Sequence, residues 1–281
     1  TFILNDYGEI LIISQAGTPS RFFASYGQGP AEMTSPSILQ VRNRKLYVLD
    51  RGTNKIVLYD LDGEWIKDIV IRDVLALSFD VDEGGNIYIP RLVPHFLGNE
   101  DIPLLHVYSP DGILLTALAQ NAIVQKDLLN IPTTPLICLT KECNIVLGLN
   151  IQGIFYLLSS SGELTQRFDI RGGAEWRESR QFQRVLDKQF GHGNSWRNRV
   201  ENLALDSRGE IYATFGGKFK RERTLAMIFN ERGEFVGRLF GNDELPFAPT
   251  CFQLANDSTV WIYSHEKEYL GVCKIDKRKA G

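Results

Sequence analysis

The stretch from Pro36 to Ile71 constrains this chain most, because the rest of the sequence consists of looser copies of it. It reads PSILQVRNRKLYVLDRGTNKIVLYDLDGEWIKDIVI, and short polar turns separate its apolar runs ILQV, KLYVL, KIVLY and EWIKDIV. Such runs predict four consecutive antiparallel strands. One sheet of this kind cannot bury itself alone, so we expect the copies to stack on one another.

Two landmarks count the copies: the glycine of the last hairpin and the apolar pair that opens the second strand. They are Gly17, Gly63, Gly112, Gly162 and Gly233, and Leu46-Tyr47, Ile87-Tyr88, Ile145-Val146, Ile211-Tyr212 and Val260-Trp261. A period of about 40 to 50 residues with four strands per copy is typical of propeller blades. The sequence therefore predicts an all-β, six-bladed β-propeller of four-stranded antiparallel blades.

The predicted propeller is one domain over residues 1–281 with a helical insertion at 171–199. Its blades span residues 1–33, 34–72, 73–120, 131–170, 198–241 and 247–281. Blade one begins with a second strand at Thr1, and blade six ends at Lys277–Gly281 with no evident outer strand. A segment before Thr1 would supply both missing strands; the alternative is a ring left open at one joint, with exposed strand edges.

Net charge indicates neither nucleic acid nor an anionic membrane as a general partner. The chain has 31 Lys and Arg against 34 Asp and Glu, which gives a net charge of -3. No apolar run reaches about 18 residues, so no transmembrane segment is predicted. Because the chain starts at Thr1 inside an expected strand, we interpret it as lacking an N-terminal segment. A signal peptide lost with that segment would predict an extracytoplasmic (periplasmic or secreted) location.

Two segments carry a family resemblance. KLYVLDRGTNKIVLYDLDGEWI resembles an NHL-type repeat, and GQGPAEMTSP resembles the linker between the first two blades of bacterial extracytoplasmic six-bladed propellers. The resemblance covers nearly the whole chain and implies the propeller fold. It leaves activity open, because such propellers include binding modules, lactonases and lyases.

All the long insertions fall on one side of the predicted blades. In a blade whose first strand lies at the axis, the loops between strands two and three and between blades emerge on one face, which we call the long-loop face. The insertions there are 91–103, 119–134, 171–199 and 216–224, whereas the opposite, tight-turn face has short turns only. Long loops on a rigid scaffold commonly bind ligands, although neutral drift gives the same pattern.

The insertion 171–199 predicts an amphipathic helix at 174–190 that either caps the propeller or binds a partner. Basic and aromatic residues around it, together with the loop GGKFKRERT, predict a binding patch for a protein or an anionic small molecule. A solvated surface with local ion pairs is the alternative. The predicted binding residues are Trp176, Arg177, Arg180, Trp196, Arg197, Lys218, Lys220, Arg221 and Arg223.

The specific motifs of hydrolases and nucleotide-binding enzymes are absent from the sequence, so we predict no catalytic residue, no metal and no cofactor. The predicted function is a non-catalytic binding or scaffold module. The competing hypothesis is a metal-dependent lactonase or lyase at the mouth of the axis, with Glu201 and Asn202 as ligands and histidines as acids or bases. Those histidines are His95, His192 and His265. RNA binding by the same patch is a third possibility, which the overall acidity opposes.

Overall fold

The computed structural model describes residues 2–4, 8–14, 18–92, 103–119, 135–149, 153–170, 200–215, 224–240, 251–256, 259–264, 269–274 and 278–279. All regular structure in these residues is β-strand. No helix in this part of the chain is long and apolar enough to cross a membrane. The chain divides into two compact units, Thr1–Asn121 and Ala122–Gly281. The predicted helix at 174–190 lies outside the described residues.

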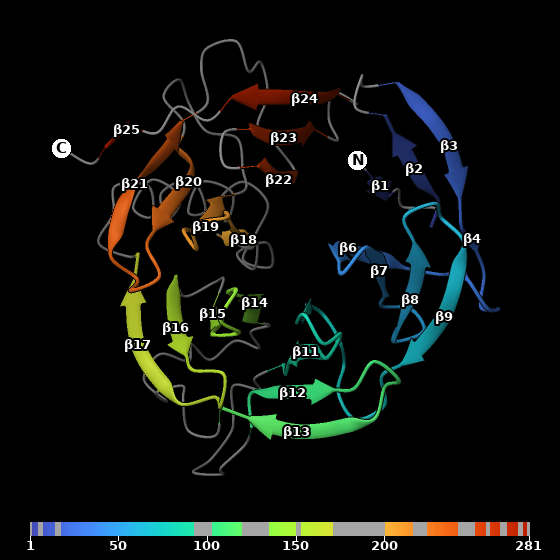
Figure 1. Ribbon diagram of the computed structural model, residues 1–281, viewed down its shortest axis with the longest axis horizontal. Coiled ribbons are helices and arrows are strands. Elements are labelled where there is room, and N and C mark those ends of the chain that lie inside the picture. The colour runs from blue at the N-terminus through green and yellow to red at the C-terminus, as the bar shows by residue number, and fades with distance from the viewer. Residues whose placement is uncertain are drawn as a thin grey trace, which may run out of the picture. The chain divides into compact units, whose positions relative to one another are not determined.

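The first unit contains three antiparallel meanders and one short parallel pair (Figure 1). The meanders are β1 (Phe2–Leu4), β2 (Ile10–Ile13) and β3 (Pro19–Phe23); β6 (Pro36–Arg42), β7 (Lys45–Asp50), β8 (Lys55–Asp60) and β9 (Trp65–Val70); and β10 (Asp80–Val81), β11 (Ile87–Pro90), β12 (Leu105–Tyr108) and β13 (Leu114–Leu118). The parallel pair is β4 (Ser25–Tyr26) and β5 (Glu32–Met33). It brackets the linker that leads from the first meander to the second.

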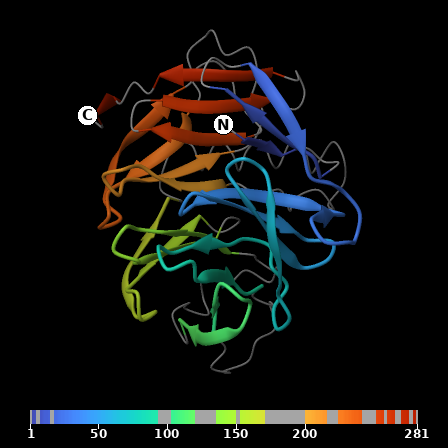
Figure 2. The same cartoon turned by 45° about the vertical axis from the view of Figure 1, so that its right-hand side comes forward.

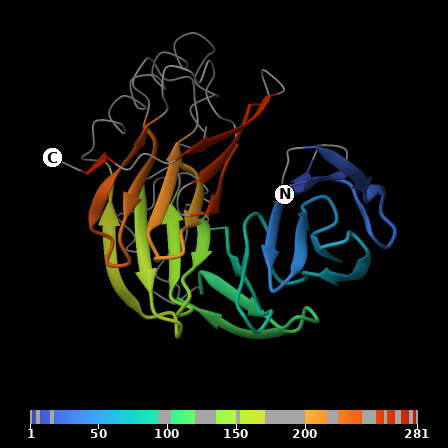
Figure 3. The ribbon, with the colours of Figure 1, turned by 45° about the horizontal axis from the view of Figure 1, so that its top comes forward.

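The second unit also contains three meanders. They are β14 (Pro135–Leu139), β15 (Ile145–Leu149), β16 (Ile154–Leu158) and β17 (Leu164–Asp169); β18 (Val200–Leu205), β19 (Ile211–Phe215), β20 (Thr224–Phe229) and β21 (Phe235–Phe240); and β22 (Cys251–Asn256), β23 (Thr259–Ser264) and β24 (Tyr269–Lys274). Figure 3 shows β14 to β17 side by side in yellow-green, and Figure 2 shows β22 to β24 in red. The first strands β14, β18 and β22 are neighbours.

Each predicted blade corresponds to one meander, and four of the meanders have the four predicted strands. Those of blades one and six have three strands within the described residues. Blade six has no outer strand within the described residues, as expected, but a further short strand follows β24. Residues Arg278–Lys279 form β25, which pairs antiparallel with Gly237 and Arg238 of β21. The C-terminal strand thus extends the outer edge of blade five rather than blade six.

Blade two shows why the meanders stack. Tyr47 and Leu49 of β7 pack in one core with Phe79 and Ile87 of blade three. The alternate residues of β7, Leu46 and Val48, belong to a second core with Ile10 of blade one. Because side chains alternate across a strand, each middle strand serves two neighbours and is buried on both faces. This explains why the sequence of β7 is almost continuously apolar.

The glycine of each outer hairpin meets two demands. Gly63, Gly112, Gly162 and Gly233 have φ of 84°, 79°, 85° and 71°, the left-handed position of a three-residue hairpin loop. Three of them also touch the outer strand of the preceding blade. A Cβ atom would lie 2.8 Å from Phe23 at Gly63, 3.0 Å from Ile69 at Gly112 and 2.4 Å from Phe168 at Gly233. The repeated glycine is therefore a joint between blades as well as a turn.

Gly233 and Gly209 form a matched pair for testing this joint. Both have positive φ, but a Cβ atom at Gly209 meets nothing closer than Glu231 at 3.9 Å. We expect Gly209→Ala to lower the free energy of unfolding by about 1–2 kcal/mol through left-handed backbone strain alone. Gly233→Ala should cost about 3 kcal/mol or more, because Phe168 is stacked on Phe155 and cannot easily move. Denaturant titration measures both variants, and equal losses would contradict the joint.

Candidate functional site

The predicted binding residues all lie in 171–199 and 216–223, outside the residues that the structure describes. The same holds for His95, His192 and His265. Glu201 and Asn202 lie on β18, where the exposed Asn202 accepts a hydrogen bond from the Leu203 amide through Oδ1 at 2.9 Å. Whether the predicted residues come together therefore stays a prediction. Within the first unit, the described part of the long-loop face consists of the segments around blades two and three.

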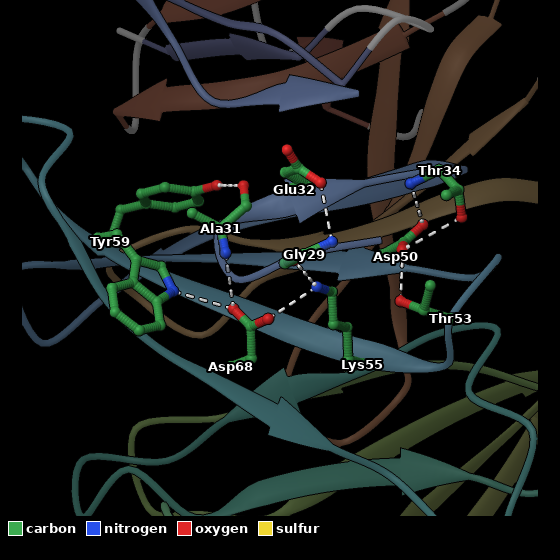
Figure 4. A network of polar contacts seen from close by, with 10 residues as sticks. Gly29, Ala31, Glu32, Thr34, Asp50, Thr53, Lys55, Tyr59 and Asp68 are labelled. Carbon is green, nitrogen blue, oxygen red and sulfur yellow. Dashed lines mark hydrogen bonds and ion pairs between the residues drawn. The ribbon is translucent and has the colours of Figure 1, made fainter. Parts of the chain in front are cut away.

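Asp50, at the end of β7, is the first of two anchors on this face (Figure 4). Its side chain is fully buried and accepts five hydrogen bonds. The donors are the amides of Ser35 at 2.6 Å, Thr34 at 3.2 Å and Gly52 at 3.2 Å, and the hydroxyls of Thr53 at 2.5 Å and Thr34 at 3.4 Å. Burial alone would raise the pKa of Asp50, but these donors together lower it. A carboxylate thus fixes the end of the linker 27–35.

The second anchor is the buried ion pair of Lys55 and Asp68 (Figure 4). Lys55 Nζ lies 2.7 Å from Asp68 Oδ2 and donates to the Gly29 carbonyl at 3.0 Å. Asp68 also accepts hydrogen bonds from Trp65 Nε1 at 2.9 Å and from the Ala31 amide at 3.4 Å. Both charges therefore have several polar partners, as buried charges require. The pair clamps the beginning of the linker onto blade two.

Tyr59 completes the same network from β8. Its hydroxyl donates to the Ala31 carbonyl at 2.6 Å, and its ring packs edge-on against Phe23 at 5.2 Å. Burial, followed by the charge of Asp68, raises the pKa of Tyr59 well above its usual value. The phenol therefore keeps its proton and remains a donor at any physiological pH.

Asn54 fixes the segment that follows blade two, as Asp50 fixes the linker that precedes it. It has a φ of 52° at the end of the β7–β8 loop. Its side-chain amide donates to the carbonyls of Ile71 at 2.7 Å and Val74 at 2.9 Å, and its Oδ1 accepts from the Ala76 amide at 2.9 Å. The short DRGTN loop thus holds both flanking connections. This role was not predicted from the sequence, in which DRGTN is a short polar turn.

Removing one partner of the ion pair tests the clamp. We expect Lys55→Met to lower the free energy of unfolding by about 2–4 kcal/mol, because Asp68 stays largely buried without its cation. Asp68→Asn should lose a similar amount, and the double variant should lose less than the sum. Denaturant titration of the four proteins measures this coupling. Strictly additive losses would contradict a direct interaction.

A second group of titratable residues lies in blade three on the same face. His106 of β12 is 7% exposed, and its Nδ1 lies 3.4 Å from the hydroxyl of the fully buried Tyr108. Burial lowers the pKa of His106, and Arg91 lowers it further, while Asp73 opposes them. Burial and Asp73 raise the pKa of Tyr108 to about 12. Both side chains are therefore neutral at neutral pH, which makes the imidazole a possible base.

A role as acid or base was predicted for three other histidines, and His106 was not singled out. The available signal was its place in LLHVY, where a polar residue interrupts an apolar strand. Such a residue needs a partner inside the fold, and Tyr108 supplies one two residues along the same strand.

The lowered pKa of His106 predicts a pH-dependent stability. Below pH 6.5, the ordinary pKa that His106 has in the unfolded chain, the unfolded chain binds a proton more readily than the folded one. The free energy of unfolding should therefore fall as the pH drops below about 6.5, by at most about 1.4 kcal/mol per pH unit from this residue. His106→Gln should make the profile shallower in that range. Parallel profiles for the two proteins in urea titrations would contradict it.

The tight-turn face is used differently, because its polar side chains join neighbouring blades. Asn43 donates to the carbonyls of Asp82 and Glu83, Arg21 binds Asp62 and Glu64, Lys67 pairs with Asp111, and Lys141 donates to Ser207. Arg42 adds a contact with buried Asp80, at 3.2 Å between Nε and Oδ1. Exposed contacts of this kind each stabilise little. They nevertheless occupy the donors and carbonyls of the turns.

Comparison with known proteins agrees with this architecture. Residues 2–99 match the model of the family DUF5128, described as a 6-bladed beta-propeller. Together with the antiparallel meanders, this match defines the class: the chain is an all-β propeller built from four-stranded blades. A search of the curated proteins found no match to the sequence.

Solved structures of similar fold include three lyases. A streptogramin B lyase has a TM-score of 0.54 and 13% identity, covering 97% of this chain and 78% of the lyase. A catalytically inactive virginiamycin B lyase from Staphylococcus aureus, solved with quinupristin, has a TM-score of 0.56 and 13% identity. The match covers 99% of this chain and 83% of the lyase. The selenomethionine-substituted virginiamycin B lyase from the same organism has a TM-score of 0.53 and 12% identity. The match covers 99% of this chain and 84% of the lyase. At such identities the likeness concerns the fold alone.

Proposed function

We propose that this propeller is a non-catalytic binding or scaffold module whose long-loop face recognises a protein or an anionic ligand outside the cytoplasm. The proposal rests on the different roles of the two faces. Contacts such as Lys67 with Asp111 use the tight turns to join blades. The long insertions, in contrast, all belong to the other face. Long loops on a rigid scaffold commonly carry the residues that bind a partner.

The anchors of blade two support this assignment. Asp50 and Asn54 fix the chain segments that precede and follow blade two. Lys55 holds the linker through its hydrogen bond to the Gly29 carbonyl. The base of the long-loop face is therefore preorganised around blade two. Preorganisation raises affinity because less conformational entropy is lost when a partner binds.

The contact residues of this proposal are the basic and aromatic residues of the two insertions near blade five. Trp176, Arg177, Arg180, Trp196 and Arg197 come from 171–199, and Lys218, Lys220, Arg221 and Arg223 come from 216–224. Arginine presents a planar fork to carboxylate or phosphate, and tryptophan offers apolar area at small entropic cost. The combination suits an anionic ligand or an acidic protein surface.

Charge reversal tests the patch with a matched control. The double variant Arg180→Glu with Arg221→Glu should elute from a heparin column, a polyanionic probe, at clearly lower salt than the native protein. The control, Arg44→Glu with Arg232→Glu, changes the net charge equally, but both residues are exposed in tight turns. It should elute close to the native protein. If both variants elute at equally lowered salt concentrations, net charge alone explains the weaker heparin binding, and the patch is contradicted.

A lyase or lactonase is the second candidate, and the fold likeness to the streptogramin B lyases is the observation that favours it. In this hypothesis Glu201 and Asn202 would hold a divalent cation, with a histidine as base. Incubation with quinupristin and a divalent cation separates the candidates. Loss of intact quinupristin in mass spectra, abolished by Glu201→Gln, would favour the enzyme. Unchanged quinupristin together with patch-dependent binding would favour the binding module.

A further inference from the structure

The outer strands share a feature that bears on assembly. After each hairpin glycine the strand contains a one-residue bulge, at Ser20, Ile66, Leu115, Thr165 and Val236. A bulge bends the edge of a sheet and discourages pairing there. Regular pairing resumes at the two residues that follow the bulge, so these two residues form the part of the edge that could accept another strand.

Blade five shows that this position does accept a strand. The two residues after its bulge are Gly237 and Arg238, and these pair with Lys279 and Arg278 of β25. The added strand runs antiparallel to β21. The outer edge of this kind of blade is therefore able to form backbone hydrogen bonds with one further strand.

Blade three differs from the other blades at the same position. The residues after the bulge are Lys67-Asp68 in blade two, Gln166-Arg167 in blade four and Arg21-Phe22 in blade one. In blade three they are Thr116-Ala117, within the uncharged segment Ile113–Leu118. Natural edge strands are commonly protected by charged residues or proline. The outer strand of blade three has neither.

The first half of this strand also exposes apolar surface. Ile113, Leu114 and Leu115 are 65%, 41% and 55% exposed. In blades two, four and five, glutamates Glu64, Glu163 and Glu234 occupy the position of Ile113, directly after the hairpin glycine. Within the described residues, β13 has β12 on one side and no strand on the other. Apolar exposure and an open edge thus coincide on one strand.

We propose that two copies of the protein associate through β13, with the strands antiparallel across a two-fold axis and Thr116 of one copy opposite Ala117 of the other. The segment ILLTAL is suited to pair with itself, because it brings no like charges together and buries no charge. The register follows that of β25 on β21, where pairing begins directly after the bulge. The two meanders would then form one continuous sheet of eight strands.

The dimer is expected to be weak and concentration-dependent. Two short edges bury less than the roughly 1,000 Å² of a stable interface. Self-association is favoured over capture of a foreign peptide because the register places the exposed Leu115 of each copy opposite Leu118 of the other, so each strand offers the apolar surface that the other needs.

Sedimentation velocity over a concentration series tests the proposal on the whole chain. The native protein should shift from monomer to dimer as concentration rises. Thr116→Arg and Leu115→Lys should each raise the dissociation constant at least about tenfold, because each brings a charge into the pairing edge. Ile66→Lys is the matched control, since Ile66 is the equivalent bulge residue of blade two and is 39% exposed. It should dimerise like the native protein.

Thermal unfolding shows whether the variants remain folded, which the exposure of Thr116 and Leu115 leads us to expect. A monomer at every concentration, or a dimer that persists in Thr116→Arg, would overturn the proposal. Hydrogen exchange on the native protein gives an independent measure. Exchange in residues 113–118 should slow as concentration rises, and exchange that does not depend on concentration would also overturn it.

Discussion

Burial of each middle strand between two neighbouring sheets is the constraint on which this structure depends. In β7 and β8 the odd and even positions enter different cores, so a blade without neighbours would expose two apolar faces. The remaining features follow from this requirement. Turn glycines allow close approach of adjacent blades, polar side chains join their turns, and the connections between blades need anchors of their own.

The linker between blades one and two shows how such an anchor is made. Its backbone leaves the sheets and would lose hydrogen bonds, and side chains from blade two replace them. Asp50 supplies acceptors, Lys55 and Tyr59 supply donors, and the resulting network leaves the linker well fixed without a regular ladder. A buried ion pair is a costly way to do so, but it specifies one arrangement of the chain.

The propeller of four-stranded antiparallel blades could be predicted from the sequence, because period-two apolar runs and turn residues act locally. The roles of Asp50 and Asn54 could not, since each depends on backbone groups that only the folded chain brings near. Pairing of β25 with β21 was missed for a related reason, as two residues carry no pattern and tertiary context chose their partner. The predicted basic patch and helix rest on segments beyond the described residues and stay predictions.

The contact between a turn glycine and the preceding outer strand has a consequence for how such chains change in evolution. Gly233 serves blade five as a turn but serves blade four as a docking surface for Phe168. A gene segment of one full period, wherever it is cut, carries one such glycine and one such outer strand. Its duplication or loss therefore recreates a complete joint, whereas a partial copy leaves an aromatic side chain facing a residue too large to admit it.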